Sequence, residues 1–461
     1  SCRRGRRGNL RRGALNQFGI RSSEFGIPNS ELNKKGSTME NKFIIENGVL
    51  TDGKSCTGDV VIPDGVTEIK RDAFACCYSL TSINIPDSVT EIGWSAFKGC
   101  TSFASVKIPE SVTKIGNRVF EGCTSLTSIT IPNSVIWIVD SAFEGCTSLT
   151  SITIPDGVAK IESHAFEGCT SLKSVTIPES VTQIDWYTFK DCSSLTSITI
   201  PDGVTKIGAF AFEGCTSLTS ITIPDSVTEI GDHAFNGCTS LTSVTIPNSV
   251  MYMGARVFYG TAWFKQRIKE NPLVIESGIL INGRAIDNHH ISHIEIPYGV
   301  RLIGAKAFWF SKSLSSVTIP ESVTMIGNGA FENCTSLTSV TIMDGVKWLD
   351  TYAFNNCTSL TSITIPDSVT MIGHGAFDDC TSLTSISISD GVTEIGAHAF
   401  SGCSSLTSIT IPGSVTEIGS CAFAKCTSLK SIIFGGTKAQ WDALGVAVVA
   451  EDVEVICEGE L

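Results

Sequence analysis

Apolar residues recur along this chain with a constant step of 23 residues. They carry the motif Ile-x-Ile-Pro, whose last slot falls at positions 63, 86, 109, 132, 155, 178, 201, 224 and 247, then at 297, 320, 343, 366, 389, 412 and 435. One step of 50 residues, from 247 to 297, interrupts the series. Self-similarity of this kind is typical of a solenoid, in which each coil contacts only its neighbours. The pattern predicts sixteen coils in two blocks.

The coil from residue 126 to 148 shows how one repeat is built. Apolar residues alternate with Ser128 and Thr130 before Pro132, which predicts a short strand that ends at the proline because proline cannot donate to a ladder. A second extended stretch and one helical turn follow. The inward positions are then Leu126, Ile129, Ile131, Val135, Ile138, Ala142, Phe143 and Cys146. Their burial offsets the ordering entropy only when neighbouring coils cover both faces, so a lone coil would not fold.

The irregular segments between and beyond the repeats predict the domain organisation. Leu273–Leu280 (LVIESGIL) repeats Phe43–Leu50 (FIIENGVL), and each has a glycine turn between apolar strands, which predicts two hairpins. Trp263–Lys269 is expected to form a short helix. The predicted parts are a leader (1–38), an N-terminal cap hairpin (39–62), a first repeat block (63–258), an internal cap of helix and hairpin (259–296), a second repeat block (297–433) and a C-terminal cap (434–461).

The leader differs in composition from the rest. It carries nine Arg and Lys against Glu24 and Glu31, a net charge of +7, whereas residues 39–461 carry 24 basic and 44 acidic residues. It lacks the apolar core of a secretory signal. We expect it to be disordered and derived from vector or linker sequence ahead of a start at Met39, with a transit peptide as the alternative.

Composition excludes several classes of protein. With 42% hydrophobic and 17% charged residues, the chain is too apolar for a disordered protein. The acidic folded part argues against a nucleic-acid partner. There is no run of eighteen or more apolar residues, so no membrane-spanning helix is expected. No nucleophile elbow, phosphate loop or zinc-protease helix appears, so we expect neither catalysis nor a cofactor.

The recurring unit L-T-S-I-T-I-P-D-S-V-T-E-I-G-x-x-A-F-x-G-C-T-S resembles the BspA-like leucine-rich repeat family over residues 43–461. Phe434–Leu444 (FGGTKAQWDAL) resembles the closing segment of bacterial members. The resemblance implies an α/β leucine-rich repeat solenoid, right-handed and curved, with mostly short parallel β-strands. It also implies a non-enzymatic, cell-surface or extracellular adhesin that binds host or matrix proteins or other cells. We expect a monomer.

Two other classes of function remain open at this stage. An intracellular, cytoplasmic interaction scaffold is the main alternative, because no secretory signal is visible and the repeated cysteines are expected to be reduced thiols. An enzyme, or a surface whose regular Ser and Thr columns order water or ice, ranks third.

Thirteen of the 18 cysteines occupy one slot of the repeat, where Thr261 and Ser311 replace cysteine beside the break. Interchangeable positions of this kind favour small buried thiols over a disulfide framework, although adjacent coils are close enough for bridges. The cysteine slot comprises Cys77, Cys100, Cys123, Cys146, Cys169, Cys192, Cys215, Cys238, Cys334, Cys357, Cys380, Cys403 and Cys426.

His289, His290 and His293 form the one cluster with metal-ligand chemistry. No second pair of Cys, Asp or Glu lies near them at a helical offset, so we favour an exposed connection over a metal site.

The position five residues after the proline slot predicts the binding surface. Most coils of the first block carry Glu or Lys there, as in Glu68 and Lys114, so the position is expected to face water. Four consecutive coils of the second block carry apolar residues instead. We predict an exposed apolar stripe that contacts a protein partner, formed by Leu302, Met325, Trp348 and Met371 and extended by Trp309 and Tyr352. The alternative is local packing near the internal cap, with Trp263 or Phe264 covering the start of the stripe.

Overall fold

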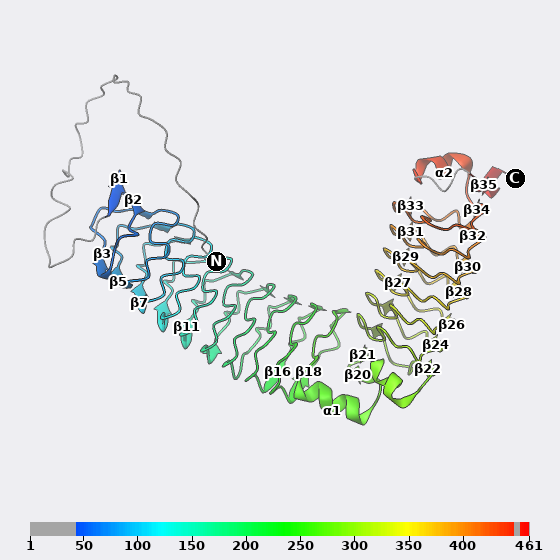
Figure 1. Cartoon of the computed structure of the whole chain (residues 1–461), viewed down its shortest axis with the longest axis horizontal. Helices are drawn as coiled ribbons and strands as arrows, with labels where there is room; N and C mark the ends of the chain where they lie inside the picture. The colour runs from blue at the N-terminus through cyan, green and yellow to red at the C-terminus, as the bar shows by residue number, and fades with distance from the viewer. Residues whose placement is uncertain (1–42, 447–451, 461) are drawn as a thin grey trace, which may run out of the picture. The chain divides into compact units, whose positions relative to one another are not determined.

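A computed structural model describes residues 43–446 and 452–460, so the predicted leader lies outside the described residues. The 23-residue repeats form stacked coils in two arrays, and most coils contribute one strand to each of two parallel ladders (Figure 1). In the coil that begins at Leu195, the main strand is reduced to a single bridge from Thr199 to Thr176. Equivalent residues pair from coil to coil, as Ser151 does with Ser128 and Ser174. The solenoid prediction is confirmed.

The main ladder contains the Ser-Ile-Thr strands. In the first array its strands are β3 (Gly58–Val61), β5 (Leu80–Asn84), β7 (Ser105–Lys107), β9 (Ser128–Thr130), β11 (Ser151–Thr153), β13 (Ser174–Val175), β16 (Ser220–Thr222) and β18 (Ser243–Thr245). In the second array they are β22 (His293–Glu295), β24 (Ser316–Ile319), β26 (Ser339–Ile342), β28 (Ser362–Ile365), β30 (Ser385–Ile388), β32 (Ser408–Ile411) and β34 (Ser431–Phe434). β35 (Glu454–Cys457) pairs with β34 and extends this ladder beyond the last predicted coil.

The second ladder consists of two-residue strands. In the first array these are β4 (Glu68–Ile69), β6 (Glu91–Ile92), β8 (Lys114–Ile115), β10 (Trp137–Ile138), β12 (Lys160–Ile161), β14 (Gln183–Ile184), β15 (Lys206–Ile207), β17 (Glu229–Ile230) and β19 (Tyr252–Met253). In the second array they are β23 (Leu302–Ile303), β25 (Met325–Ile326), β27 (Trp348–Leu349), β29 (Met371–Ile372), β31 (Glu394–Ile395) and β33 (Glu417–Ile418). The second residue of each strand faces the core.

The predicted helical turn is a series of hydrogen-bonded turns instead. Ser141 has a φ of 55°, which interrupts any right-handed helix at this point. The amides of Ser141 and Phe143 donate to carbonyls of the following coil, at 3.0 and 2.9 Å. Only the intervening amides, such as that of Cys146, bond within the coil to the residue three positions earlier. Inter-coil bonding therefore replaces the helical pattern.

Phenylalanine rings form the centre of the core. In the first array they stack from Phe74 to Phe258, and in the second from Phe308 to Phe423, with ring centroids 5.0 to 5.8 Å apart. Offset stacking of this kind adds to the hydrophobic contribution of each ring. We call these two columns the phenylalanine ladders.

Each phenylalanine ladder is closed at its start by a hairpin, as predicted. β1 (Ile44–Glu46) and β2 (Val49–Asp52) pair antiparallel, and so do β20 (Val274–Glu276) and β21 (Ile279–Asn282). A glycine after each hairpin covers the first ring. A Cβ built on Gly53 would lie 2.2 Å from the ring of Phe74, and one on Gly283 would lie 2.1 Å from that of Phe308. Only glycine fits this close approach.

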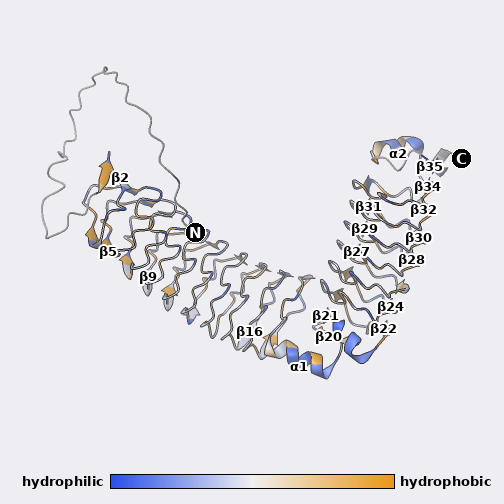
Figure 2. Ribbon diagram, viewed as in Figure 1, coloured by the Kyte–Doolittle hydropathy of each residue, from blue (hydrophilic) through white to orange (hydrophobic). Residues whose placement is uncertain are grey.

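Each array is followed by a short helix, α1 (Ala262–Glu270) or α2 (Lys438–Ala443). Trp263 packs edge-on against Phe258 at 5.1 Å, and Trp441 packs against Phe434 at 5.5 Å. Thr261 occupies the cysteine slot because it caps α1, where its hydroxyl accepts a hydrogen bond from the Phe264 amide. Figure 2 shows α1 as a mixture of hydrophobic and hydrophilic residues. Its Trp263 and Phe264 side chains are buried. The predicted helix at 263–269 is confirmed.

We expect Phe212→Ala to lower the free energy of unfolding by about 3 to 5 kcal/mol, because it leaves a cavity between two stacked neighbours. Phe210→Ala is the matched control, since Phe210 also stacks on both sides but is half-exposed. Its cost should be about 1 kcal/mol. Urea unfolding followed by circular dichroism measures both, and equal losses would contradict the assignment of the phenylalanine ladder as the core.

Candidate functional site

The predicted stripe residues occupy neighbouring strands of the second ladder. Leu302 pairs with Met325, Met325 with Trp348, and Trp348 with Met371. Trp348 is 46% exposed, and Met325 and Met371 are half-buried. These three residues form one contiguous apolar surface, which we call the stripe. Glu394 and Glu417 follow Met371 in the same column, so the stripe has an acidic end.

The expected exposure of Leu302 is wrong. Leu302 is 2% exposed and belongs to the same apolar cluster as Met253, in the last coil of the first array. The backbones meet at this point, because the Ala305 amide donates to the Met253 carbonyl at 3.1 Å. Arg301 also donates to the Val250 carbonyl at 2.5 Å. The first array therefore covers the start of the column, which a pattern within one coil does not reveal.

Trp309 and Tyr352 lie outside the stripe column. Trp309 occupies the slot twelve residues after the proline position and contacts Arg256 and Lys306. Tyr352 packs edge-on against His374, and its hydroxyl lies 3.0 Å from Nε2 of that residue. The structure does not bring these two aromatic residues together with Trp348.

Tyr252 is an aromatic neighbour that the sequence reasoning missed. It occupies the stripe slot in the last coil of the first array and pairs with Glu229. Burial raises the pKa of Tyr252 to about 12, and the charges of Asp232, Asp350 and Glu229 add to this shift. Burial also raises the pKa of Asp350, in the same coil as Trp348. The sequence did contain a signal for Tyr252, because it occupies the same slot as Leu302 in the last coil before the break.

The three histidines of the cluster lie in and around the short 3₁₀ helix η1 (Arg284–His289) and strand β22. His289 ends η1, and His290 follows it in a left-handed conformation. His293 lies on strand β22, and its Nδ1 lies 2.7 Å from the Ser316 hydroxyl. Within the described ranges, no group of three or more His, Cys, Asp or Glu residues is placed to hold a metal ion.

The cysteine slot forms a buried column of free thiols. From Cys100 onward, each thiol of the column donates to the carbonyl of the phenylalanine in the preceding coil, as Cys169 does to Phe143 at 3.2 Å, whereas Cys77 donates to the Gly53 carbonyl. Burial raises the pKa of Cys169 and of Cys380 to about 12. A thiol with a raised pKa stays protonated and unreactive, so this column serves packing and inter-coil hydrogen bonding.

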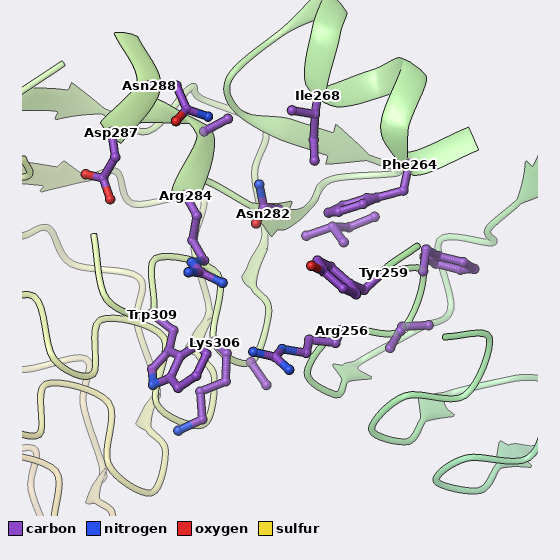
Figure 3. Close-up of a pocket in the computed structure, with 15 residues that line it drawn as sticks. Arg256, Tyr259, Phe264, Ile268, Asn282, Arg284, Asp287, Asn288, Lys306 and Trp309 are labelled. Carbon is purple, nitrogen blue, oxygen red and sulfur yellow. The ribbon is translucent and has the colours of Figure 1, made fainter. Parts of the chain in front are cut away.

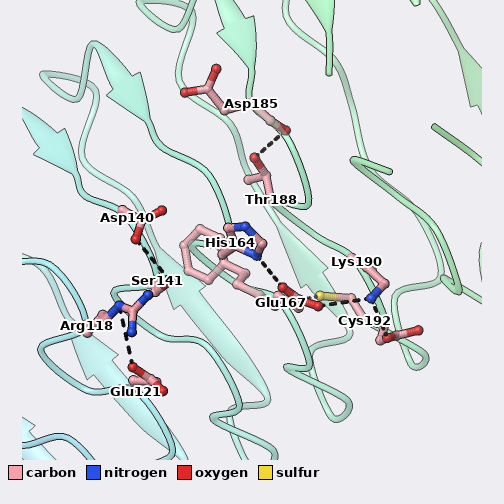
Figure 4. A network of polar contacts seen from close by, with 12 residues as sticks. Arg118, Glu121, Asp140, Ser141, His164, Glu167, Asp185, Thr188, Lys190 and Cys192 are labelled. Carbon is pink, nitrogen blue, oxygen red and sulfur yellow. Dashed lines mark hydrogen bonds and ion pairs between the residues drawn. The ribbon is translucent and has the colours of Figure 1, made fainter. Parts of the chain in front are cut away.

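A second outward column carries the residues with positive φ. His164, Tyr187, Phe210 and His233 stack face to face in four successive coils, with centroids 4.6 to 4.9 Å apart. Three residues further along, some coils of the first array carry carboxylates that balance neighbouring cations. Arg118 pairs with Glu121 at 3.9 Å, and Lys190 pairs with Glu167 at 3.1 Å (Figure 4). The ring faces are occupied by one another, so this column offers mainly ring edges to a ligand.

The stacked coils, the two ladders and the capped ends define a leucine-rich repeat solenoid. The family described as "BspA type Leucine rich repeat region" matches residues 45–173, 159–282, 279–392 and 349–440. The chain belongs to this family. No match to the chain is found among the curated proteins.

Several solved structures are similar. A leucine-rich repeat protein from Bacteroides ovatus is 32% identical, with 82% of this chain and 92% of that chain covered and a TM-score of 0.43. A leucine-rich cell surface protein from Faecalibacterium prausnitzii is also 32% identical, with 88% and 96% covered and a TM-score of 0.36. In the described part of this chain, no helix is both long and apolar enough to cross a membrane.

Trp348→Glu should change the free energy of unfolding by less than about 0.5 kcal/mol, because the side chain is largely exposed. Leu302→Lys should cost about 3 kcal/mol or more, because it buries a charge where the two arrays meet. Chemical denaturation of both variants compares them directly. A large loss for Trp348→Glu would mean that the stripe belongs to the core.

In native protein at pH 8, iodoacetamide should alkylate exposed Cys76 and Cys421 and leave Cys169 and Cys380 unmodified. Because the pKa values of the two buried thiols are raised from 9.0 to about 12, folding favours their protonated form. Their contribution to stability is complete below pH 9 and falls as the pH rises towards 12. Peptide mapping by mass spectrometry locates the labels, and rapid native labelling of Cys169 would contradict this account.

Proposed function

We propose that this chain is a non-enzymatic protein-binding protein whose partner contacts the stripe of Met325, Trp348 and Met371. The observation that carries the proposal is the exposure of Trp348 between two methionines in a column where most other coils carry charged residues. Tryptophan and methionine are enriched at interfaces, and contiguous exposed apolar residues mark interaction surfaces.

The charges near the stripe specify the partner further. Glu394 is half-buried and Glu417 is exposed, and both continue the column beyond Met371. A partner with an apolar patch flanked by Lys or Arg would match the apolar centre and the acidic end. Such complementarity contributes more to the association rate and to specificity than to affinity.

The finer proposal is a cell-surface or extracellular adhesin that binds host or matrix proteins, as the family resemblance implies. A cytoplasmic scaffold is the second candidate, and the free thiols of the described cysteines favour it, because reducing compartments keep thiols in this state. Fractionation of cells that express the native gene product separates the two candidates. Recovery in the surface fraction supports the adhesin, and recovery in the cytosol alone contradicts it.

Trp348→Glu should reduce binding of the fluorescently labelled protein to decellularised epithelial matrix at least tenfold, because it places a carboxylate at the centre of the apolar contact. Trp137→Glu is the matched control. Trp137 occupies the same slot in the first array and is 54% exposed, but it pairs with Lys160 rather than with apolar residues.

Saturation binding curves for both variants measure the effect, and thermal unfolding shows whether each remains folded. Equal binding by the wild-type protein and by Trp348→Glu, or equal losses in both variants, would contradict the role of the stripe.

A further inference from the structure

A cavity of about 290 Å³ lies where the last coil of the first array and the first coil of the second array meet (Figure 3). Trp309 lines it together with half-buried and buried apolar side chains of α1 and β21. Three cationic side chains also line the cavity. They are Arg256, Arg284 and Lys306, and they come from three separate segments of the chain.

The cations surround one aromatic ring. The guanidinium carbons of Arg256 and Arg284 lie 4.9 and 5.2 Å from the centre of the Trp309 ring, and Nζ of Lys306 lies 5.8 Å from it. This concentration of positive charge contrasts with the net charge of −13 of the whole chain. Its position therefore calls for a specific explanation.

Comparison with the other coils shows what the cavity lacks. The slot twelve residues after the proline position carries a carboxylate in many coils of the first array, namely Glu121, Glu144, Glu167 and Glu213. Two of these carboxylates pair with nearby cations, Glu121 with Arg118 and Glu167 with Lys190, as Figure 4 shows. In the two coils that border the cavity, the same slot holds Tyr259 and Trp309.

The two arginines of the cavity consequently have no carboxylate partner. Among the residues that the structure describes, neither Arg256 nor Arg284 forms an ion pair. Lys306 pairs with Glu332 of the next coil. Asp287 also lines the cavity, but its carboxylate accepts hydrogen bonds from the amide and hydroxyl of Ser313, at 2.9 and 2.5 Å.

Two buried donors in the cavity are also unsatisfied. Nε of Arg284 and Nε1 of Trp309 are inaccessible to solvent and have no hydrogen-bond partner in the described structure. A buried donor without an acceptor is unfavourable. Because these two atoms are inaccessible, they do not open onto the cavity, and a ligand would bind the remaining N–H groups of the guanidinium groups. Burial lowers the pKa of Lys306; the charge of Asp232 opposes this shift, and the charge of Arg256 adds to it.

We propose that this cavity binds a small organic acid, with its carboxylate between Arg256 and Arg284 and its apolar body against Tyr259, Phe264 and Trp309. Arginine binds carboxylates in a two-point geometry, and the carboxylate would replace the one that the repeat supplies in other coils. The volume is near the lower end for ligand sites, which limits the body to about one ring. This site is separate from the stripe.

Phenylacetate and its neutral analogue phenylacetamide test the carboxylate requirement by isothermal titration calorimetry with the full chain. Phenylacetate should bind at least about tenfold more tightly, the factor expected for one charge-assisted hydrogen bond. Equal affinity for acid and amide, or no binding of phenylacetate, would overturn the proposal.

The same carboxylate chemistry occurs on free acids and on peptide C-termini. Acetyl-Gly-Phe with a free carboxylate distinguishes the two sources. Tighter binding of this peptide than of phenylacetate would assign the site to a terminal carboxylate, whereas weaker binding would assign it to a free acid. Either result would require a free carboxylate on the ligand and would support the proposed carboxylate site.

Arg284→Gln and Arg256→Gln should each weaken phenylacetate binding about tenfold or more. Arg71→Gln is the matched control, because Arg71 lies 5.6 Å from the ring centre of Trp94 outside the cavity and should leave affinity unchanged. Because Arg256 is exposed, its variant should retain the fold if the other does not. Undiminished binding by a folded Arg256→Gln variant, or an equal loss in Arg71→Gln, would overturn the assignment.

Discussion

The phenylalanine ladders are the constraint on which the rest of the structure depends. A ring in one coil is buried only if the adjacent coils place rings above and below it, so the 23-residue spacing must hold through each array. The backbone hydrogen bonds also depend on the presence of an adjacent coil. Amides at alternate positions near each ring bond to the next coil rather than to their own, as at Phe143. The cysteine thiols reinforce this connection through bonds to the phenylalanine carbonyls.

Both ends of a ladder then present the same physical problem, namely an aromatic face without a neighbour. The chain solves it twice with the same devices. Gly53 and Gly283 allow the backbone of a hairpin to approach the first ring, and Trp263 covers the last ring of the first ladder from α1. At the end of the second array, Trp441 of α2 packs against Phe434, beside the phenylalanine ladder. The residues that form these caps interrupt the repeat pattern, which explains why Thr261 replaces a cysteine at the first helix.

The sequence predicted the features that depend on local pattern. Strand positions, the two hairpins and α1 followed from alternation, turn glycines and spacing, which act within a few residues. Predictions from the sequence were wrong where coils far apart in the chain come into contact. Leu302 was expected to be exposed because its slot faces water elsewhere, but the first array covers it. The cavity was missed because Arg256, Arg284 and Trp309 belong to different slots and segments. The helical turn was wrong because residues such as Ser141 adopt a positive φ.

The duplicated caps have a consequence for how such a chain can change in length. Because each array carries its own start and end, coils inserted or removed within an array leave both termini of its ladder covered. Unequal recombination between repeats, in units of 23 residues, is then tolerated by the architecture. The junction behaves differently, since its contacts join particular residues such as Arg301 and Val250 rather than equivalent ones. The number of coils in each array can therefore vary while the contacts at the junction between the arrays stay the same.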